Sequence, residues 1–202
     1  MIRFAAVFAV FSLFGFQGLR PIEEYGFDAR FETIRACRED KRVFVETGTA
    51  GGNGIYMSIF AGFEEIYSTE VDYEQYAFGL SRFHNEPTIH LFHDDSASAL
   101  RKFLPGIEEP VLFWLDAHYC GNAPQYFEKC PVLRELAAIG EHPVKTHTIL
   151  IDDMRLFGTD EFDGISVDDL IQAIRKINPA YEISFEDGFV PKDVLVAKIR
   201  SK

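Results

Sequence analysis

Acidic side chains recur along the chain, each at the end of a short apolar run or directly after one. They are Glu46, Glu70, the pair Asp94 and Asp95, Asp116, and the pair Asp152 and Asp153. A carboxylate can accept hydrogen bonds from hydroxyl groups, bind a hard metal cation or exchange a proton. A solvent-exposed edge of a protein would carry some acids by chance, but an acid at the end of each of five apolar runs is more than chance predicts. These residues are therefore candidates for chemistry at one edge of a sheet.

The apolar runs predict strands, and the segments between them predict helices. Strands are expected at 42–46, 65–70, 88–93, 110–116 and 147–152, and helices at 55–60, 73–83, 97–103, 130–139 and 166–177. The last two strands, 181–186 and 194–199, leave no room for a helix between them and should pair antiparallel. The sequence thus predicts an α/β fold with a doubly wound, mostly parallel, seven-stranded sheet and a C-terminal antiparallel hairpin. Trp114, inside the fourth strand, is expected in the core.

A glycine-rich turn follows the first strand, where residues 46–54 read ETGTAGGNG. Glycines let the backbone approach a ligand closely or adopt positive φ, and the start of the following helix favours an anionic group. The turn lacks the Gly-x-Gly-x-x-Gly spacing of dinucleotide-binding sites and the Lys-Ser/Thr pair of a phosphate-binding loop. Glu70, at the end of the second strand, is placed to accept both hydroxyls of a ribose. Together these features favour a ribose-containing cofactor.

Asp116, Asp152 and Asp153 end two strands that are neighbours in the expected sheet. Three carboxylates at one rim repel one another, and a bound cation is the simplest explanation for them. Oxygen ligands favour Mg²⁺, Mn²⁺ or Ca²⁺ over Zn²⁺. His118 lies two residues beyond Asp116 and would share its face of an extended chain, so it is a candidate general base or further ligand. The alternatives are a solvated rim, a helix cap at Asp153 and a surface histidine.

Composition limits the classes of partner. The 202 residues fit one domain, and 32 Asp and Glu against 20 Lys and Arg give a formal charge of −12. An acidic chain without clustered cations is a poor ligand for nucleic acid, because phosphate contacts need positive charge. We therefore expect a small-molecule partner and no nucleic acid. The oligomeric state cannot be inferred from the sequence.

The first twenty residues differ from the rest. Arg3 precedes an apolar run that extends to Phe16, which is short for a membrane span. A secretory signal, a membrane anchor and an apolar helix docked on the protein are the open alternatives, so a cytoplasmic, a secreted and a membrane-anchored location all stay open. Cys120 and Cys130 bracket an insert, either as a disulfide or as two free thiols.

Over about residues 40–200 the chain resembles the class I S-adenosylmethionine-dependent methyltransferases. The resemblance rests on the glycine turn, on Glu70, on Asp95 and Ser96 after the third strand, and on the closing hairpin. Residues 45–49 (VETGT), 113–119 (FWLDAHY) and 149–154 (ILIDDM) are most similar to small O-methyltransferases of the macrocin O-methyltransferase group. Residues 49–53 (TAGGN) depart from that superfamily's Gly-x-Gly-x-Gly run. Beyond the leader and the 119–131 insert, the chain has no dedicated substrate domain.

The resemblance implies a Rossmann-like methyltransferase domain over 21–202 that uses S-adenosylmethionine to methylate a small hydroxylated acceptor. It assigns cofactor contacts to Glu46, Gly48, Thr49, Gly52, Glu70, Asp95 and Ser96. It also implies a divalent ion, expected to be Mg²⁺, held by Asp116, Asp152 and Asp153, with His118 and Asp116 as the catalytic residues. Two other readings stay open, because doubly wound sheets carry many activities. One is a nucleotide-sugar-dependent transferase, and the other is a non-catalytic module that binds the cofactor weakly and needs no metal.

Overall fold

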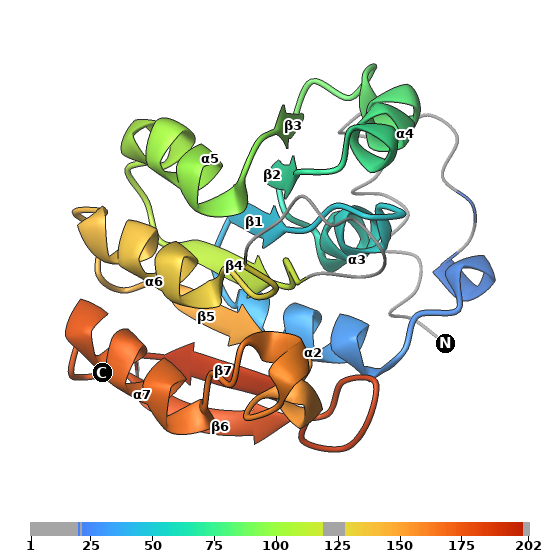
Figure 1. The fold of residues 1–202 in the computed structure, drawn as a ribbon. Helices are drawn as coiled ribbons and strands as arrows, with labels where there is room; N and C mark the ends of the chain where they lie inside the picture. Colours follow the sequence, from blue (N-terminus) through green and yellow to red (C-terminus); the bar gives the residue numbers. More distant parts are fainter. Residues whose placement is uncertain (1–19, 21, 119–127, 200–202) are drawn as a thin grey trace.

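A seven-stranded sheet forms the centre of the computed structural model, which describes residues 20, 22–118 and 128–199 (Figure 1). The strand order is β3-β2-β1-β4-β5-β7-β6. The strands are β1 (Val43–Thr47), β2 (Glu65–Glu70), β3 (Ile89–His93), β4 (Val111–Leu115), β5 (Thr148–Ile151), β6 (Glu182–Glu186) and β7 (Val194–Lys198). The first five run parallel, whereas β7 lies antiparallel between β5 and β6. The predicted fold class is confirmed.

Helices cover both faces of the sheet (Figure 1). One face packs against α5 (Ser96–Phe103), α6 (Val132–Glu141) and α7 (Val167–Ile177). The other packs against α2 (Ala29–Arg38), α3 (Asn53–Ala61) and α4 (Tyr73–Phe83). Short 3₁₀ turns complete the described elements: η1 (Ile22–Tyr25), η2 (Leu104–Gly106), η3 (Met154–Leu156) and η4 (Asp160–Phe162).

Residue alternation explains why the central strands are mostly apolar. In β1, Val43 and Val45 join the core beneath α5, α6 and α7, while Phe44 points to the opposite core. In β4, Phe113 and Trp114 divide in the same way, and Trp114 is buried as expected. Successive side chains of a strand point to opposite faces, so a strand covered on both faces favours apolar residues on each of them.

Helix α2 is the one α-helix among the described residues that the sequence reading did not include. Asp28 caps it by accepting a hydrogen bond from the Arg30 N–H at 3.0 Å. Phe31, Ile34 and Cys37 are its buried apolar residues, spaced three apart along one face. This helix matters for the site because it carries Arg30 to the acidic rim.

The remaining boundaries differ from expectation by a few residues at most. Helix α6 begins at Val132 rather than at residue 130, because Pro131 occupies the position before its first turn. Asp95 is the cap of α5 and accepts from the Ser98 N–H at 3.0 Å, whereas Ser96 is the first helical residue.

The leader and Cys120 lie outside the described residues, so the expectations made for residues 1–19 stay predictions. Within the part of the chain that the structure describes, no helix has the length and apolar character to cross a membrane. Cys130 is a buried free thiol.

Candidate active site

The carboxyl ends of the parallel strands open onto a groove of about 940 Å³. Its walls come from the turn after β1, the end of β2, the connection from β3 to α5, and the end of β4. Six residues expected at the site line this one groove: Gly48, Glu70, Asp95, Ser96, Asp116 and His118. They belong to four different strand ends, and the parallel topology brings them together.

The glycine turn needs glycine at three positions, of which Gly54 is the tightest, because a Cβ there would lie 1.7 Å from Glu46 Oε1. Gly48 has a φ of +84°, and a Cβ there would lie 2.9 Å from the backbone oxygen of Asp116. Gly52 has a φ of +79°, and its Cβ would lie 2.8 Å from the ring of Phe83 on α4. Both the backbone conformation and the close approach exclude larger residues. The turn therefore sits in contact with the end of β4 on one side and with α4 on the other.

Glu70 fixes the floor of the groove beside this turn. Its Oε2 accepts a hydrogen bond from the Ala50 N–H at 2.9 Å, and its Oε1 accepts one from the Asp72 N–H at 2.9 Å. Each carboxylate oxygen has a second lone pair, so both retain capacity to accept from a hydroxyl group. Glu70 thus joins the glycine turn to the β2–α4 connection while lining the groove.

Glu46 and Thr49 lie beneath the turn and, like Gly52, are not among the described residues that line the groove. Ser68 Oγ donates to Glu46 Oε2 at 2.6 Å and lies 2.6 Å from Thr49 Oγ1. Complete burial, with the nearby charges of Asp116 and Glu70, raises the pKa of Glu46 to about 8. These residues support the turn from below.

Asp95 is already engaged by a cation. Arg134 on α6 donates to both of its oxygens, at 2.9 and 2.8 Å. This bidentate pair is the main reason why the pKa of Asp95 lies below its ordinary value. Arg134 also pairs with Glu128, so it joins the cap of α5 to the segment that precedes α6.

Glu135 is a buried carboxyl group that the sequence reading missed. Burial raises its pKa to about 7, which the nearby hydroxyls of Ser96 and Thr47 partly oppose. Its Oε1 has no hydrogen-bond partner of good geometry among the described residues. It lines a small cavity of about 10 Å³ that Asp116 and His118 also border, a volume that fits about one water molecule. The first-turn position of Glu135 in an otherwise amphipathic helix is a weak signal, and only the fold reveals its burial.

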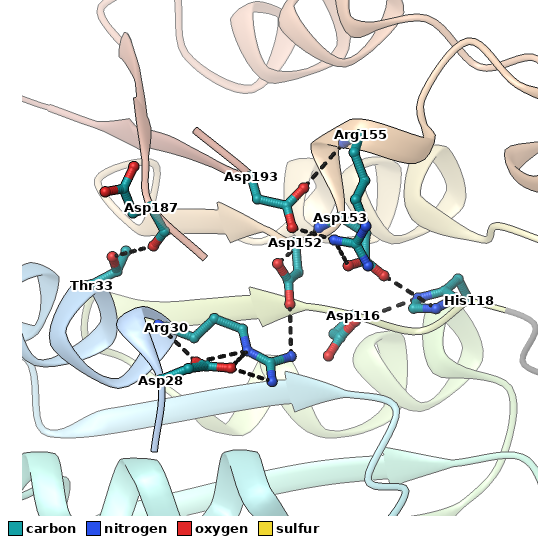
Figure 2. Close-up of polar contacts among 10 residues, drawn as sticks. All are labelled: Asp28, Arg30, Thr33, Asp116, His118, Asp152, Asp153, Arg155, Asp187 and Asp193. Carbon is teal, nitrogen blue, oxygen red and sulfur yellow. Dashed lines mark hydrogen bonds and ion pairs between the residues drawn. The ribbon is translucent and has the colours of Figure 1, made fainter. Parts of the chain in front are cut away.

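At the far end of the groove, His118 lies between two carboxylates (Figure 2). Its Nδ1 is 3.4 Å from Asp116 Oδ1, and its Nε2 is 3.3 Å from Asp153 Oδ2. Burial alone would lower the pKa of His118, but the hydrogen bond and charge of Asp116, together with Asp153 and Asp152, raise it above the ordinary value. The expected neighbours Asp116, His118 and Asp153 thus form one polar group.

The side chain of Asp152 is more deeply buried than that of Asp153, and both of its oxygens accept hydrogen bonds. Its Oδ1 accepts from the Asp153 N–H at 2.8 Å, and its Oδ2 accepts from Arg30 Nη1 at 3.3 Å. Arg30 is held in turn by the two oxygens of Asp28 (Figure 2). Burial and the charges of Asp116 and Asp153 raise the pKa of Asp152 to about 7 despite the arginine.

The donor set at this rim suits a hard divalent cation. Ligand atoms of Asp116, His118 and Asp153 lie within 4.8 Å of one another, and so do those of Asp152, Asp153 and Asp193. Two arginines, Arg30 and Arg155, already neutralise part of the charge. Five carboxylates nevertheless surround them, and the excess negative charge favours a further cation. The carboxylates are Asp28, Asp116, Asp152, Asp153 and Asp193.

Sequence reasoning missed Arg30, Arg155 and Asp193. Arg155 stands two residues after Asp153, and this nearness to an acidic pair was the available signal. Arg30 and Asp193 are separated from the pair by more than a hundred and by forty residues, respectively. Only the packing of α2 and the placement of β7 bring them to the rim.

Comparison with solved structures identifies the same architecture in several methyltransferases. A putative methyltransferase from Streptococcus mutans in complex with S-adenosylhomocysteine (SAH) aligns with a TM-score of 0.60 and 13% identity, over 91% of this chain and all of that one. An O-methyltransferase from Bacillus cereus in complex with SAH aligns with a TM-score of 0.58 and 12% identity, over 97% and 91% of the two chains. A putative rRNA-methylase from Clostridium thermocellum aligns with a TM-score of 0.59 and 13% identity, over 89% and 97%.

No protein-family model and no curated protein sequence matches the chain. At 12–13% identity the structural likeness carries the fold, and neighbours that include an O-methyltransferase and a putative rRNA-methylase do not select an acceptor. The chain has the Rossmann-like fold of these methyltransferases, with Glu70, Asp95, Asp116, Asp152 and Asp153 gathered at the carboxyl-terminal edge of its parallel strands.

Proposed function

We propose that this protein is an S-adenosylmethionine-dependent O-methyltransferase that acts on a small hydroxylated acceptor with the help of a divalent cation. One observation carries the proposal. A single groove is lined both by the glycine turn with Glu70 and by the pair Asp116 and His118. A cofactor bound across the turn would direct its reactive group toward residues able to handle a proton.

The cofactor half would hold S-adenosylmethionine by its ribose and amino-acid groups. Glu70 supplies two carboxylate oxygens at the floor, while Gly48 exposes backbone at the position nearest Asp116. Asp95 and Ser96 border the same space from the start of α5. Glu46, Thr49 and Gly52 act indirectly in this proposal, by holding the turn in shape.

The acceptor half would carry the chemistry. Bound S-adenosylmethionine would supply a sulfonium methyl group: the acceptor oxygen would attack it, so that a C–O bond forms, the C–S bond breaks and SAH leaves. The hydroxyl proton would pass to Nε2 of neutral His118, whose Nδ1–H faces Asp116 and is oriented by it. A bound Mg²⁺ would lower the pKa of the acceptor hydroxyl. Of the expected ligands, Asp116 and Asp153 lie with His118 in one group whose ligand atoms are within 4.8 Å of one another, whereas Asp152 forms a second such group with Asp153 and Asp193.

Calorimetric titration of S-adenosylmethionine and of SAH into the full chain tests the cofactor half. We expect micromolar binding that Glu70→Ala abolishes and Glu108→Ala, at an exposed acid away from the groove, leaves unchanged. Absence of binding by folded protein would refute the proposal and favour the nucleotide-sugar alternative.

A separate experiment tests the acceptor half. SAH release is measured with a panel of catechols and sugars, with Mg²⁺ and with a chelator. Turnover that requires Mg²⁺ and is lost in His118→Ala supports the proposed chemistry. Weak cofactor binding that Mg²⁺ does not change, without turnover on any compound of the panel, would instead support a non-catalytic module.

A further inference from the structure

The segment that follows β5 has an unusual backbone. Asp153 has a φ of +62° and a ψ of +39°, which is left-handed and uncommon for a residue with a side chain. It is also buried. Such a conformation persists only where the surroundings hold it in place.

Three successive backbone N–H groups show what holds it. The Asp153 N–H donates to Asp152 Oδ1 at 2.8 Å, so the side chain of Asp152 holds the first N–H group of the turn. The next two N–H groups both bind Asp193: Met154 donates to its backbone oxygen at 2.9 Å, and Arg155 donates to its Oδ1 at 3.1 Å. Asp193, the residue before β7, therefore clamps the turn from outside it.

Asp193 also holds the side chain that orients Asp153 (Figure 2). Arg155 Nη1 contacts Asp193 Oδ2 and lies 2.6 Å from Asp153 Oδ1. The other oxygen of Asp153, Oδ2, is thereby left facing His118. The two oxygens of Asp153 thus have separate partners, and the arginine that fixes one of them is anchored on Asp193.

The surroundings of Asp193 are closed to solvent. Its side chain is fully buried. Gly188, in the β6–β7 loop, packs so closely that a Cβ there would lie 3.2 Å from the Asp193 Cβ and 2.9 Å from Val194. A buried carboxylate that accepts from one backbone N–H and from one guanidinium has little freedom to move.

We propose that Asp193 is a positioning residue: through the turn and through Arg155 it sets the Asp153 carboxylate so that Oδ2 faces Asp116 and His118. This role rests on the proposed function, because Asp153 is one of the proposed cation ligands. Asp193 itself makes no contact with cofactor or acceptor in this proposal. Loss of the Asp193 side chain should weaken cation binding near Asp153 and leave cofactor binding, which uses residues of β1, β2 and α5, unchanged.

Binding of Mn²⁺, followed by electron paramagnetic resonance, and binding of SAH, followed by calorimetry, test the proposal on the full chain. Asp193→Asn keeps an acceptor for the Arg155 N–H but removes the charge that anchors the guanidinium. We expect it to weaken Mn²⁺ binding about tenfold or more, as removal of an outer partner of a metal ligand does, and to change SAH affinity less than about twofold. The matched control is Asp187→Asn, at an exposed acid of the same loop whose carboxylate accepts from the Lys192 N–H, and whose bond to Thr33 uses the backbone oxygen that the substitution keeps.

Non-additivity separates positioning from general destabilisation. If Asp193 acts through Arg155, then Asp193→Asn combined with Arg155→Met should bind Mn²⁺ no more weakly than the weaker single variant. Unchanged Mn²⁺ affinity in Asp193→Asn would overturn the proposal. Parallel losses of Mn²⁺ and SAH binding that follow the fall in melting temperature would also overturn it.

Amide hydrogen exchange keeps the proposal testable if the wild-type protein binds no Mn²⁺. That result would refute the metal part of the proposed function. The contacts of Asp193 with the Met154 and Arg155 N–H groups would then be tested by themselves. In Asp193→Ala we then expect exchange protection at the Arg155 N–H to fall about tenfold or more, while the β4 amides keep theirs. Unchanged protection at Arg155 would overturn the positioning role.

Discussion

Replacing Glu46 by glutamine should make the protein more stable, relative to wild type, as the pH rises. The folded-state pKa of Glu46 is raised to about 8 from an ordinary 4.5, mainly by burial. Between these two values the folded protein binds a proton that the unfolded chain releases, so wild-type stability falls as the pH rises through this window. Glutamine keeps the shape and an acceptor for Ser68 but has no proton to lose.

The expected size follows from the same shift. Each pH unit within the window is worth about 1.4 kcal/mol. The stability difference between Glu46→Gln and wild type should therefore grow by about 4 kcal/mol between pH 5 and pH 8. Any fixed cost of burying the amide adds equally at each pH and cancels from this change. For a chain of this size, the melting-temperature difference should change by about 8–16 °C.

Differential scanning calorimetry of both proteins at pH 5, 6, 7 and 8 measures this change, with Glu108→Gln at an exposed position as the control. If the difference between Glu46→Gln and wild type stays constant across the series, the buried, protonated state of Glu46 is refuted. An SAH titration of the same variant shows whether the cofactor contact implied for Glu46 is direct. Direct contact predicts weaker binding despite the greater stability.

Three further predictions concern other parts of the fold. Burial and the neighbouring His142 lower the pKa of His147 to about 3, so stability should be complete above pH 6.5 and fall below it by up to about 1.4 kcal/mol per pH unit. Urea unfolding at pH 5 and 7 should show a smaller loss in His147→Gln, and equal losses would contradict this. Gly48→Ala places a Cβ at positive φ and against the backbone of Asp116, so it should lower the free energy of unfolding by about 2–5 kcal/mol, measured by thermal unfolding. Its affinity for SAH should also fall. A variant as stable as wild type would show that the turn can relax. Ser166→Ala removes the capping box of α7 and should cost about 1 kcal/mol without altering SAH binding, whereas a loss of binding would point to a wider rearrangement.

The architecture was predictable because the central strands carry a strong local signal. Each face of β1 and β4 is covered, so their apolar runs had no competing interpretation as amphipathic helices. Helix α2 was missed for the opposite reason. It contains four charged residues among ten, and among its apolar residues only Phe31, Ile34 and Cys37 mark its buried face.

The candidate site was predictable in its acids and not in their partners. Glu70 ends β2, and Asp116 and Asp153 closely follow β4 and β5, so the topology alone gathers them at one edge. The sequence reading explained the repulsion between carboxylates by a cation or by a solvated rim, and it did not include Arg30 and Arg155, which balance part of the charge. An ion pair between distant segments depends on the final packing of helices and loops, which no local pattern encodes.

The reversed direction of β7 has a consequence for how the surroundings of Asp153 can diversify. Parallel strands present only their last residues to the carboxyl-terminal edge of the sheet, but an antiparallel strand presents its beginning there. The β6–β7 hairpin therefore brings Asp193 to the same edge as the ends of the parallel strands. The contacts of Asp153 and the glycine turn are thus encoded in separate stretches of the chain. Changes in the hairpin can alter what holds Asp153 while the glycine turn, Glu70 and the start of α5 keep their arrangement.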